Sequence, residues 1–230
     1  VDGAVFTHVS NVFGYILPVK EMAAECRAAG VPFVLDAAQS AGSLPVDFGA
    51  LGAEFIAMPG HKGLYGPQGT GLLLCGDPGK PLLFGGTGTL SREKTMPEDL
   101  PERLEAGTVN VPGAAGLAAG IRLVRGMTPE KIFARGHGQT MACGRALEEM
   151  GYRVFTGPHQ AMTLSFQGKA DCEEIAEALG SRGIAVRAGL HCAPLAHESA
   201  GTLEKGTVRI SFGHDASPAQ TNALLRALGV

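Results

Sequence analysis

Short apolar runs alternate with a longer helical pattern through the first third of the chain. The stretch Pro18–Ala29 has helical spacing, with proline at its first position and Gly30 as its stop. Apolar runs over Ala4–His8, Phe33–Leu35 and Phe55–Met58, and a further one in "GTGLLLCG", predict buried strands. Strands that alternate with helices form parallel sheets with covered faces. The pattern therefore predicts an α/β fold with a mainly parallel sheet.

The character of the chain changes near residue 126. Helical patterns follow Pro112, run over Pro129–Met150 and close the chain over Ser217–Leu228. Between them lie the apolar runs "YRVF", "MTLSF", "IAVRAGLH" and "GTVRISFG", and a helical pattern in "CEEIAEALGSRG". This mixture predicts a smaller α+β domain over residues 126–230, which follows a larger domain over residues 1–125.

Four polar side chains directly follow predicted strands. Asp36 and Gln39 come after one strand, and His61 and Lys62 come after the next, in the loop "MPGHKGLYGPQGTG". Ligands of parallel sheets bind beyond the carboxyl ends of the strands, so we expect these residues to line one site. A lysine with a lowered pKa forms Schiff bases with aldehydes, and pyridoxal phosphate needs such a lysine and an acidic partner for its ring nitrogen. The alternative is that Asp36 caps the following turn and Lys62 is a solvated loop residue.

Six segments decide between these alternatives. In order along the chain they are "THVSN", "LDAAQSAGSLPVDF", "MPGHKGLYGPQGTG", "RLEAGTVN", "VRAGLHCAP" and "GTVRISFG". Together they resemble the class V aminotransferase family, and within it the cysteine desulfurase and selenocysteine lyase group. The resemblance implies the type I fold of pyridoxal-phosphate-dependent transferases, with a large domain that is incomplete here and a small C-terminal domain. The chain resembles the later part of a family member, without the N-terminal portion that holds part of the phosphate site.

The resemblance also implies residues that hold the cofactor, pyridoxal 5'-phosphate. By similarity Lys62 would bond the cofactor aldehyde, and His61 would contact the phosphate. Asp36 would pair with the ring nitrogen and Gln39 with the ring hydroxyl. Thr108 would reach the cofactor phosphate of a second subunit, which implies a homodimer. Where relatives often carry a phosphate-binding serine, this chain has Pro59, which removes one contact.

The substrate side of the site follows in the same way. Asn11 and Arg209 would hold the substrate carboxylate, with Arg187 near the same pocket. Cys192 would accept sulfur as a thiolate, in a loop "RAGLHCAPLAHESAG" that is expected to be mobile and to offer the imidazole of His191 as a neighbour. The other cysteines lie in apolar patterns and are expected to be packing residues.

The resulting prediction is a pyridoxal-phosphate enzyme that takes sulfur from L-cysteine, leaves L-alanine and forms a persulfide on Cys192. A related enzyme acting on selenocysteine, cysteine sulfinate or another amino acid is one alternative. A truncated and inactive fragment is a second, and a scaffold that kept the fold without activity is a third. A sulfur-acceptor protein is a possible partner of the active enzyme.

Composition narrows the partners and the location. The formal net charge is -3 and no block of basic residues occurs, which disfavours nucleic acid and anionic membranes as partners. The five cysteines form no C-x-x-C pair, and no signal peptide or bilayer-spanning run is visible, which together predict a cytoplasmic protein. The histidines lack the spacing of metal ligands, so no metal is expected.

Overall fold

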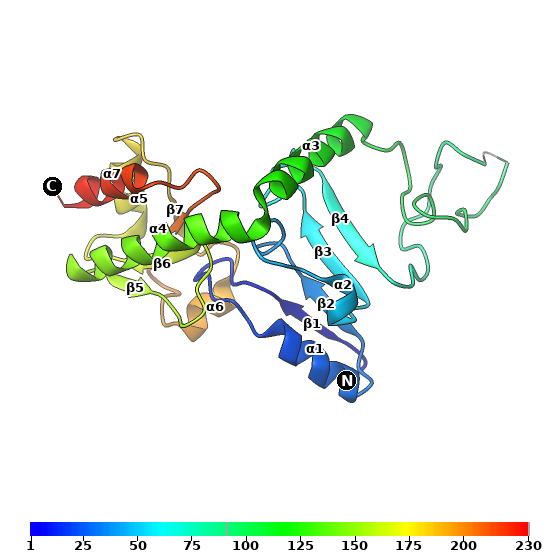
Figure 1. Ribbon diagram of the computed structural model, residues 1–230, viewed down its shortest axis with the longest axis horizontal. Coiled ribbons are helices and arrows are strands. Elements are labelled where there is room, and N and C mark those ends of the chain that lie inside the picture. Colours follow the sequence, from blue (N-terminus) through cyan, green and yellow to red (C-terminus); the bar gives the residue numbers. More distant parts are fainter. Residues whose placement is uncertain (91, 230) are drawn as a thin grey trace.

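The computed structural model describes residues 1–90 and 92–229, and it contains two four-stranded sheets. Helices and strands follow one another along the chain as β1 (Ala4–Thr7), α1 (Val19–Ala28), β2 (Phe33–Asp36), α2 (Phe48–Leu51), β3 (Phe55–Pro59), β4 (Gly71–Cys75), α3 (Val111–Met127), α4 (Pro129–Glu149), β5 (Arg153–Phe155), β6 (Thr163–Gln167), α5 (Cys172–Gly180), β7 (Arg187–Gly189), α6 (Pro194–Ser199), β8 (Thr207–Ser211) and α7 (Pro218–Leu228). Figure 1 shows the two sheets in separate halves of the molecule. The N-terminal half holds β1 to β4 with α3 along that sheet, and the C-terminal half holds β5 to β8 with α4 along that sheet.

The first sheet has the order β1-β2-β3-β4, in which the first three strands are parallel and β4 is antiparallel to β3. The prediction of a mainly parallel sheet is therefore confirmed. The strand β4 is antiparallel because the loop between β3 and β4 reverses the chain directly without a crossover helix. Its strand β1 is an edge strand and not the buried strand that was predicted, since Val5 is 71% exposed.

One face of this sheet is covered and the other is open. Phe6, Leu35 and Ile56 are register partners on the face that packs against α1, α2 and α3 in a single core. Side chains alternate along strands, so the partners Asp36, Ala57 and Leu73 point to the opposite face. That face is open: Leu73 is 51% exposed.

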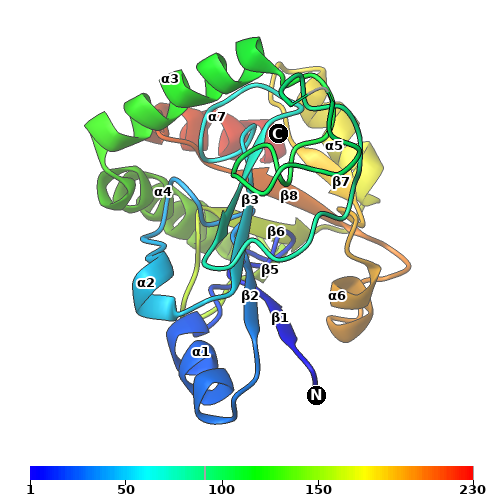
Figure 2. The ribbon, with the colours of Figure 1, turned by 90° about the vertical axis from the view of Figure 1, so that its right-hand side faces the viewer.

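The second sheet has the order β5-β6-β8-β7, and its neighbouring strands are antiparallel. A core of buried residues from α4, α5, α7 and the sheet lies beneath it, centred on Phe166 and Leu147. The predicted strand around "IAVRAGLH" is confirmed only over Arg187–Gly189, and the predicted mobile stretch after it contains the helix α6. Figure 2, turned by 90°, shows α6 as a separate feature at the lower right.

A short segment of the first half is held by hydrogen bonds to the second half. Three carbonyl groups after β1 accept hydrogen bonds, each at 2.7 Å. Ser165 Oγ donates to Val12, Gln160 Nε2 donates to Phe13, and the Ala161 N–H donates to Gly14. Phe13 also packs against Phe155, with ring centroids 5.0 Å apart. This segment therefore fixes the end of β1 against β6. The boundary predicted at residues 125 and 126 lies in the last turns of α3 and remains a prediction.

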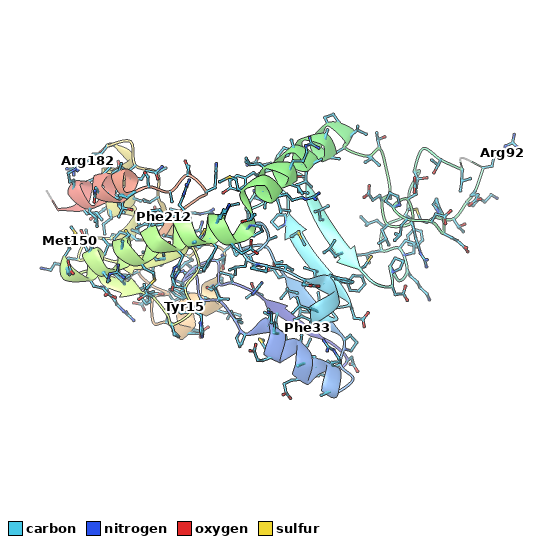
Figure 3. All side chains as sticks on the ribbon, viewed as in Figure 1. Tyr15, Phe33, Arg92, Met150, Arg182 and Phe212 are labelled. Atoms are coloured by element: carbon cyan, nitrogen blue, oxygen red, sulfur yellow. The ribbon has the colours of Figure 1, made fainter. Side chains whose placement is uncertain are left out.

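Residues 76–90 and 92–110 connect β4 to α3 by turns and bends. We name these residues the arm; Figure 1 shows it projecting away from both sheets, and Figure 3 shows Arg92 at its outer end. Several of its apolar side chains are strongly exposed, among them Leu82 (90%), Leu83 (70%) and Phe84 (73%), whereas Met96 is buried (8%).

Candidate active site

A cavity of about 420 Å³ lies where the two halves meet. Its walls come from the segments after β1 and β2, from the loop between β3 and β4, and from the start of β6. Further walls come from β7 and the turn after it, and from β8 and the residue that follows it. Most of the predicted site residues line it: Asn11, Gln39, Lys62, Arg187, Cys192 and Arg209.

Backbone contacts fix the loop that carries Lys62. The Tyr65 N–H donates to the Lys62 carbonyl at 3.0 Å, and Gly60 N–H donates to Thr70 at 2.7 Å. Gly42 adopts a φ of +86°, and a Cβ on it would lie 1.9 Å from the carbonyl oxygen of Gly63. Only glycine permits this approach, so the segment after β2 and the Lys62 loop touch backbone to backbone. This explains why so many glycines surround the lysine.

The two arginines of the cavity lie side by side. Arg187 on β7 and Arg209 on β8 are direct register partners in an antiparallel pair, which places them on the same face. Burial lowers the pKa of Arg209 most, the positive charge of Arg187 lowers it further, and the Cys192 thiol acts in the opposite direction. The buried Nε of Arg209 has no hydrogen-bond partner among the described residues. Two guanidinium groups with an unused donor form a site for an anion.

Asn11 joins the arginines to the cysteine loop. Its side-chain amide donates to the His191 carbonyl at 2.7 Å, while its own carbonyl accepts from Arg209 Nη1 at 2.8 Å. Both contacts cross between the two halves. Asn11 therefore lies at the cavity as predicted, with its amide already engaged.

Cys192 and His191 point in different directions. Both residues line the cavity, but Cys192 is exposed whereas His191 is only 5% exposed and its ring nitrogen contacts Thr207. Burial, followed by the charge of Arg209, lowers the pKa of His191 to about 4, so the imidazole is neutral near pH 7. Whether His191 assists Cys192 as a neighbouring imidazole stays a prediction, and a neutral ring would act on the thiol as a proton acceptor and not as a cation. Arg209 lines the same cavity as Cys192, and the thiol acts to raise the pKa of its guanidinium.

The structure does not bring three predicted residues to this cavity. Asp36 lies on the open face of the first sheet, and its carboxylate accepts a hydrogen bond from the Ala38 N–H at 2.8 Å, which is the capping contact weighed as an alternative. His61 and Thr108 are exposed and do not line the cavity either. Thr108 lies in the arm, beyond β4. The roles of all three residues remain predictions.

Sequence reasoning missed several polar residues that line the cavity. Tyr65 closes the Lys62 loop, and its hydroxyl accepts a hydrogen bond from the His214 N–H at 3.1 Å. Thr163 and Ser211 face each other across β6 and β8, 3.3 Å apart between their hydroxyl oxygens. Tyr65 stands within a quoted motif and could have been found there. The other pair depends on a strand register that the sequence does not reveal.

Comparison with known proteins identifies the family. The model of the family described as aminotransferase class-V matches residues 3–224. The chain belongs to the class V aminotransferase family. The resemblance carried by the six loop segments is thereby confirmed.

Relatives and solved structures of this class V aminotransferase chain agree with that result. A probable cysteine desulfurase from Methanothermobacter thermautotrophicus is 36% identical over 213 residues, which cover 86% of this chain and 53% of the relative. A cysteine desulfurase from Synechococcus elongatus is 40% identical over 199 residues, covering 82% of this chain and 31% of the relative. The apo structure of a cysteine desulfurase from Thermococcus onnurineus NA1 matches with a TM-score of 0.90 and 32% identity, over 99% of this chain and 59% of that one. The predicted fold class is confirmed, and the chain spans between about a third and three fifths of the length of these three proteins.

Two further observations concern metals and membranes. In the described part of the chain, histidine, cysteine and acidic side chains do not gather in groups of three that could hold a metal ion. None of the helices within residues 1–90 and 92–229 has the length and apolar character that crossing a bilayer requires.

Proposed function

We propose that the protein is a pyridoxal-phosphate-dependent cysteine desulfurase, which removes sulfur from L-cysteine, releases L-alanine and retains the sulfur as a persulfide on Cys192. The observation that carries the proposal is that Lys62, Cys192 and Arg209 line one cavity although they come from three separate segments. Relatives named cysteine desulfurase support the same activity. A fold alone does not require this set of side chains.

The residues of the cavity fit the cofactor on its aldehyde side. Lys62 supplies an amine that would bond the aldehyde, and Gln39 supplies a side-chain amide for the ring hydroxyl. When it is bound, pyridoxal phosphate acts as an electron sink that weakens bonds at the α-carbon of an amino acid. Asp36 would hold the ring nitrogen, and His61 and Thr108 would hold phosphate, if the open sheet face and the arm are covered in the assembled protein.

The arginines would hold the carboxylate of the substrate. A planar guanidinium donates two parallel hydrogen bonds to a carboxylate, and Arg209 keeps its Nε free for such a contact. The positive charges of Arg209 and Arg187 would also offset the negative charge of a thiolate at Cys192. Held in this way, L-cysteine would present its sulfur toward the exposed side of the cavity, where Cys192 lies.

The net sulfur transfer needs one nucleophile and one proton. The Cys192 thiolate forms an S–S bond with the substrate sulfur as the C–S bond breaks, and the electron pair of that bond is taken up with a proton at the substrate β-carbon. The products are L-alanine and a persulfide on Cys192, and no external oxidant or reductant is required. The persulfide would then pass to an acceptor, for which a sulfur-acceptor protein is our proposal.

We also propose a homodimer in the cytoplasm. The arm and the open sheet face expose apolar side chains, including Phe84 and Leu73, that a second copy could cover. Thr108 lies in this arm, as expected for a residue that reaches the cofactor of another subunit.

The first test is cofactor capture. Pyridoxal phosphate is added to the purified chain, the absorption spectrum is recorded, and borohydride reduction with peptide mass analysis then locates the adduct. We expect the adduct on Lys62, absent in Lys62→Ala and retained in Lys131→Ala, a matched change at an exposed lysine of α4. A folded chain without any adduct at Lys62 would favour the alternative of an inactive fragment.

A further inference from the structure

The turn that carries Cys192 has an unusual backbone. His191 and Cys192 adopt φ angles of +52° and +61°, so two consecutive residues other than glycine lie in the left-handed region. Side chains with a Cβ rarely occupy this region, and they persist there only when surrounding contacts hold them. The contacts that hold this pair therefore decide where the Cys192 thiol lies.

The His191 side chain is anchored within the C-terminal half. Its Nε2 lies 3.1 Å from both the carbonyl and the hydroxyl oxygens of Thr207. Its ring also packs at 5.7 Å from the ring of His197, which is fully buried and bonded to Thr202 at 2.8 Å. These contacts fix the imidazole ring, but they do not involve the peptide unit that links His191 to Cys192.

The carbonyl of His191 belongs to that peptide unit, and it accepts the 2.7 Å hydrogen bond from the Asn11 amide. Asn11 is well placed to hold it. Its own carbonyl is bonded by Arg209, and it lies inside a tight turn in which Gly14 N–H donates to Ser10 at 3.0 Å. Because these contacts restrain the backbone of Asn11, its side-chain amide in turn restrains the His191 carbonyl.

We propose that Asn11 is a positioning residue for Cys192, which holds the left-handed His191–Cys192 turn at the cavity from the opposite half of the molecule. The inference rests on the proposed function, since that function gives the position of Cys192 its value. It also reassigns Asn11, because an amide that holds the His191 carbonyl leaves the substrate carboxylate to the arginines.

Hydrogen–deuterium exchange of the whole chain tests the proposal without cofactor. Asn11→Ala removes the donor, and Asn11→Asp keeps the shape while replacing the amide N–H groups with oxygen. In both variants we expect backbone exchange in peptides covering residues 190–196 to accelerate roughly three- to tenfold, the effect of one hydrogen bond on a local opening equilibrium. Asn222→Asp, the same substitution at an exposed site on α7, serves as the matched control and should leave these peptides unchanged.

Two further readouts separate positioning from general damage and from substrate binding. Capture of pyridoxal phosphate on Lys62 should be equal in the variants and the unchanged chain, so a failure of the proposed function would show itself independently. With L-cysteine as substrate, we expect kcat to fall severalfold while KM stays within about twofold. Unchanged exchange at residues 190–196 in both Asn11 variants would overturn the proposal, as would a raised KM with an unaltered kcat.

Discussion

The loops that carry Lys62 and Cys192 line the same cavity, but different contacts hold them. The Lys62 loop is fixed by backbone against backbone, at Gly42 and Gly63, where no side chain fits. The Cys192 turn adopts a left-handed backbone without glycine and is held by side chains, those of Asn11 and His191. Under the proposed function, a lysine that bonds an aldehyde would gain from a rigid support, whereas a thiol that receives and passes on sulfur would gain from a support that can be released.

Removal of the Cys192 thiol is the change with the largest expected effect on activity. In Cys192→Ser we expect L-alanine release from L-cysteine to be abolished, because a hydroxyl does not replace a thiolate as sulfur acceptor. Capture of pyridoxal phosphate on Lys62 should persist, since the Lys62 loop has its own support. The same substitution at Cys26, which is half-buried on α1, is the control. Unimpaired alanine release from Cys192→Ser would disprove the persulfide.

The backbone support of Lys62 can be broken at Gly42. A Cβ at this position meets the carbonyl of Gly63 at 1.9 Å and also forces alanine into a positive φ. We expect Gly42→Ala to lower the free energy of unfolding by roughly 3 kcal/mol or more, from overpacking combined with left-handed strain. Urea denaturation measures the change.

Gly69→Ala is the matched control for this prediction. Gly69, in the Lys62 loop, also has a positive φ, +73°, but its Cβ would meet nothing within 4 Å. Gly69→Ala should therefore lower the free energy of unfolding only by the backbone strain, about 1 kcal/mol. Equal losses in the two variants would mean that the contact between Gly42 and Gly63 does not support the loop.

The sequence was sufficient to predict the lysine loop but not the way in which the cysteine turn is held. Glycine, proline and lysine within one short motif indicated the Lys62 loop. The six segments, in their order along the chain, contain most of the residues that line the cavity. His191 was expected as a neighbouring imidazole of Cys192, and the sequence did not show that its ring is buried against Thr207 and His197. That burial depends on contacts with Thr207 and His197, which stand within quoted segments but meet His191 only through the folding of the chain.

Asp36 shows a second limit of sequence reasoning. The end of its strand was predicted correctly, because an apolar run followed by an acidic residue is a local pattern. Alternation along β2 then assigns Asp36 to the face opposite Leu35, but which face is covered depends on the packing of α1 and α3. The reversal into β4 was missed for the same reason, since it depends on pairing with β3.

Acid should lower the stability of the folded chain through the buried, neutral His191. Its pKa is lowered to about 4 from the ordinary 6.5, so the unfolded chain takes up a proton below pH 6.5 while the folded chain does not. Stability therefore falls as the pH drops from 6.5 toward 4, with roughly 3 kcal/mol at most from this residue. We expect His191→Asn, which tolerates the left-handed backbone, to reduce this loss in urea denaturation at pH 7.5 and 4.5.

In His191→Asn the loss of stability between pH 7.5 and 4.5 should be smaller than in the unchanged chain, but it should not disappear. Burial also lowers the pKa values of His8 and His197, which act in the same direction. His159→Asn, at an exposed position, is the control and should leave the pH dependence unchanged. If His191→Asn lost as much stability in acid as the unchanged chain, His191 would not be the buried neutral group described above.

The smallest expected effect concerns the contact that ties the Lys62 loop to the C-terminal half. The Tyr65 hydroxyl accepts the His214 N–H at 3.1 Å, and the two rings pack edge to face at 4.7 Å. Tyr65→Phe keeps the ring contact and removes the acceptor, so we expect a loss of about 1 kcal/mol in the free energy of unfolding. Cofactor capture on Lys62 should be unchanged, because Gly42 and Gly63 still hold the loop. Loss of capture in a stably folded Tyr65→Phe would show that the support of Lys62 extends across both halves, and the contrast between the two loops would then be one of degree.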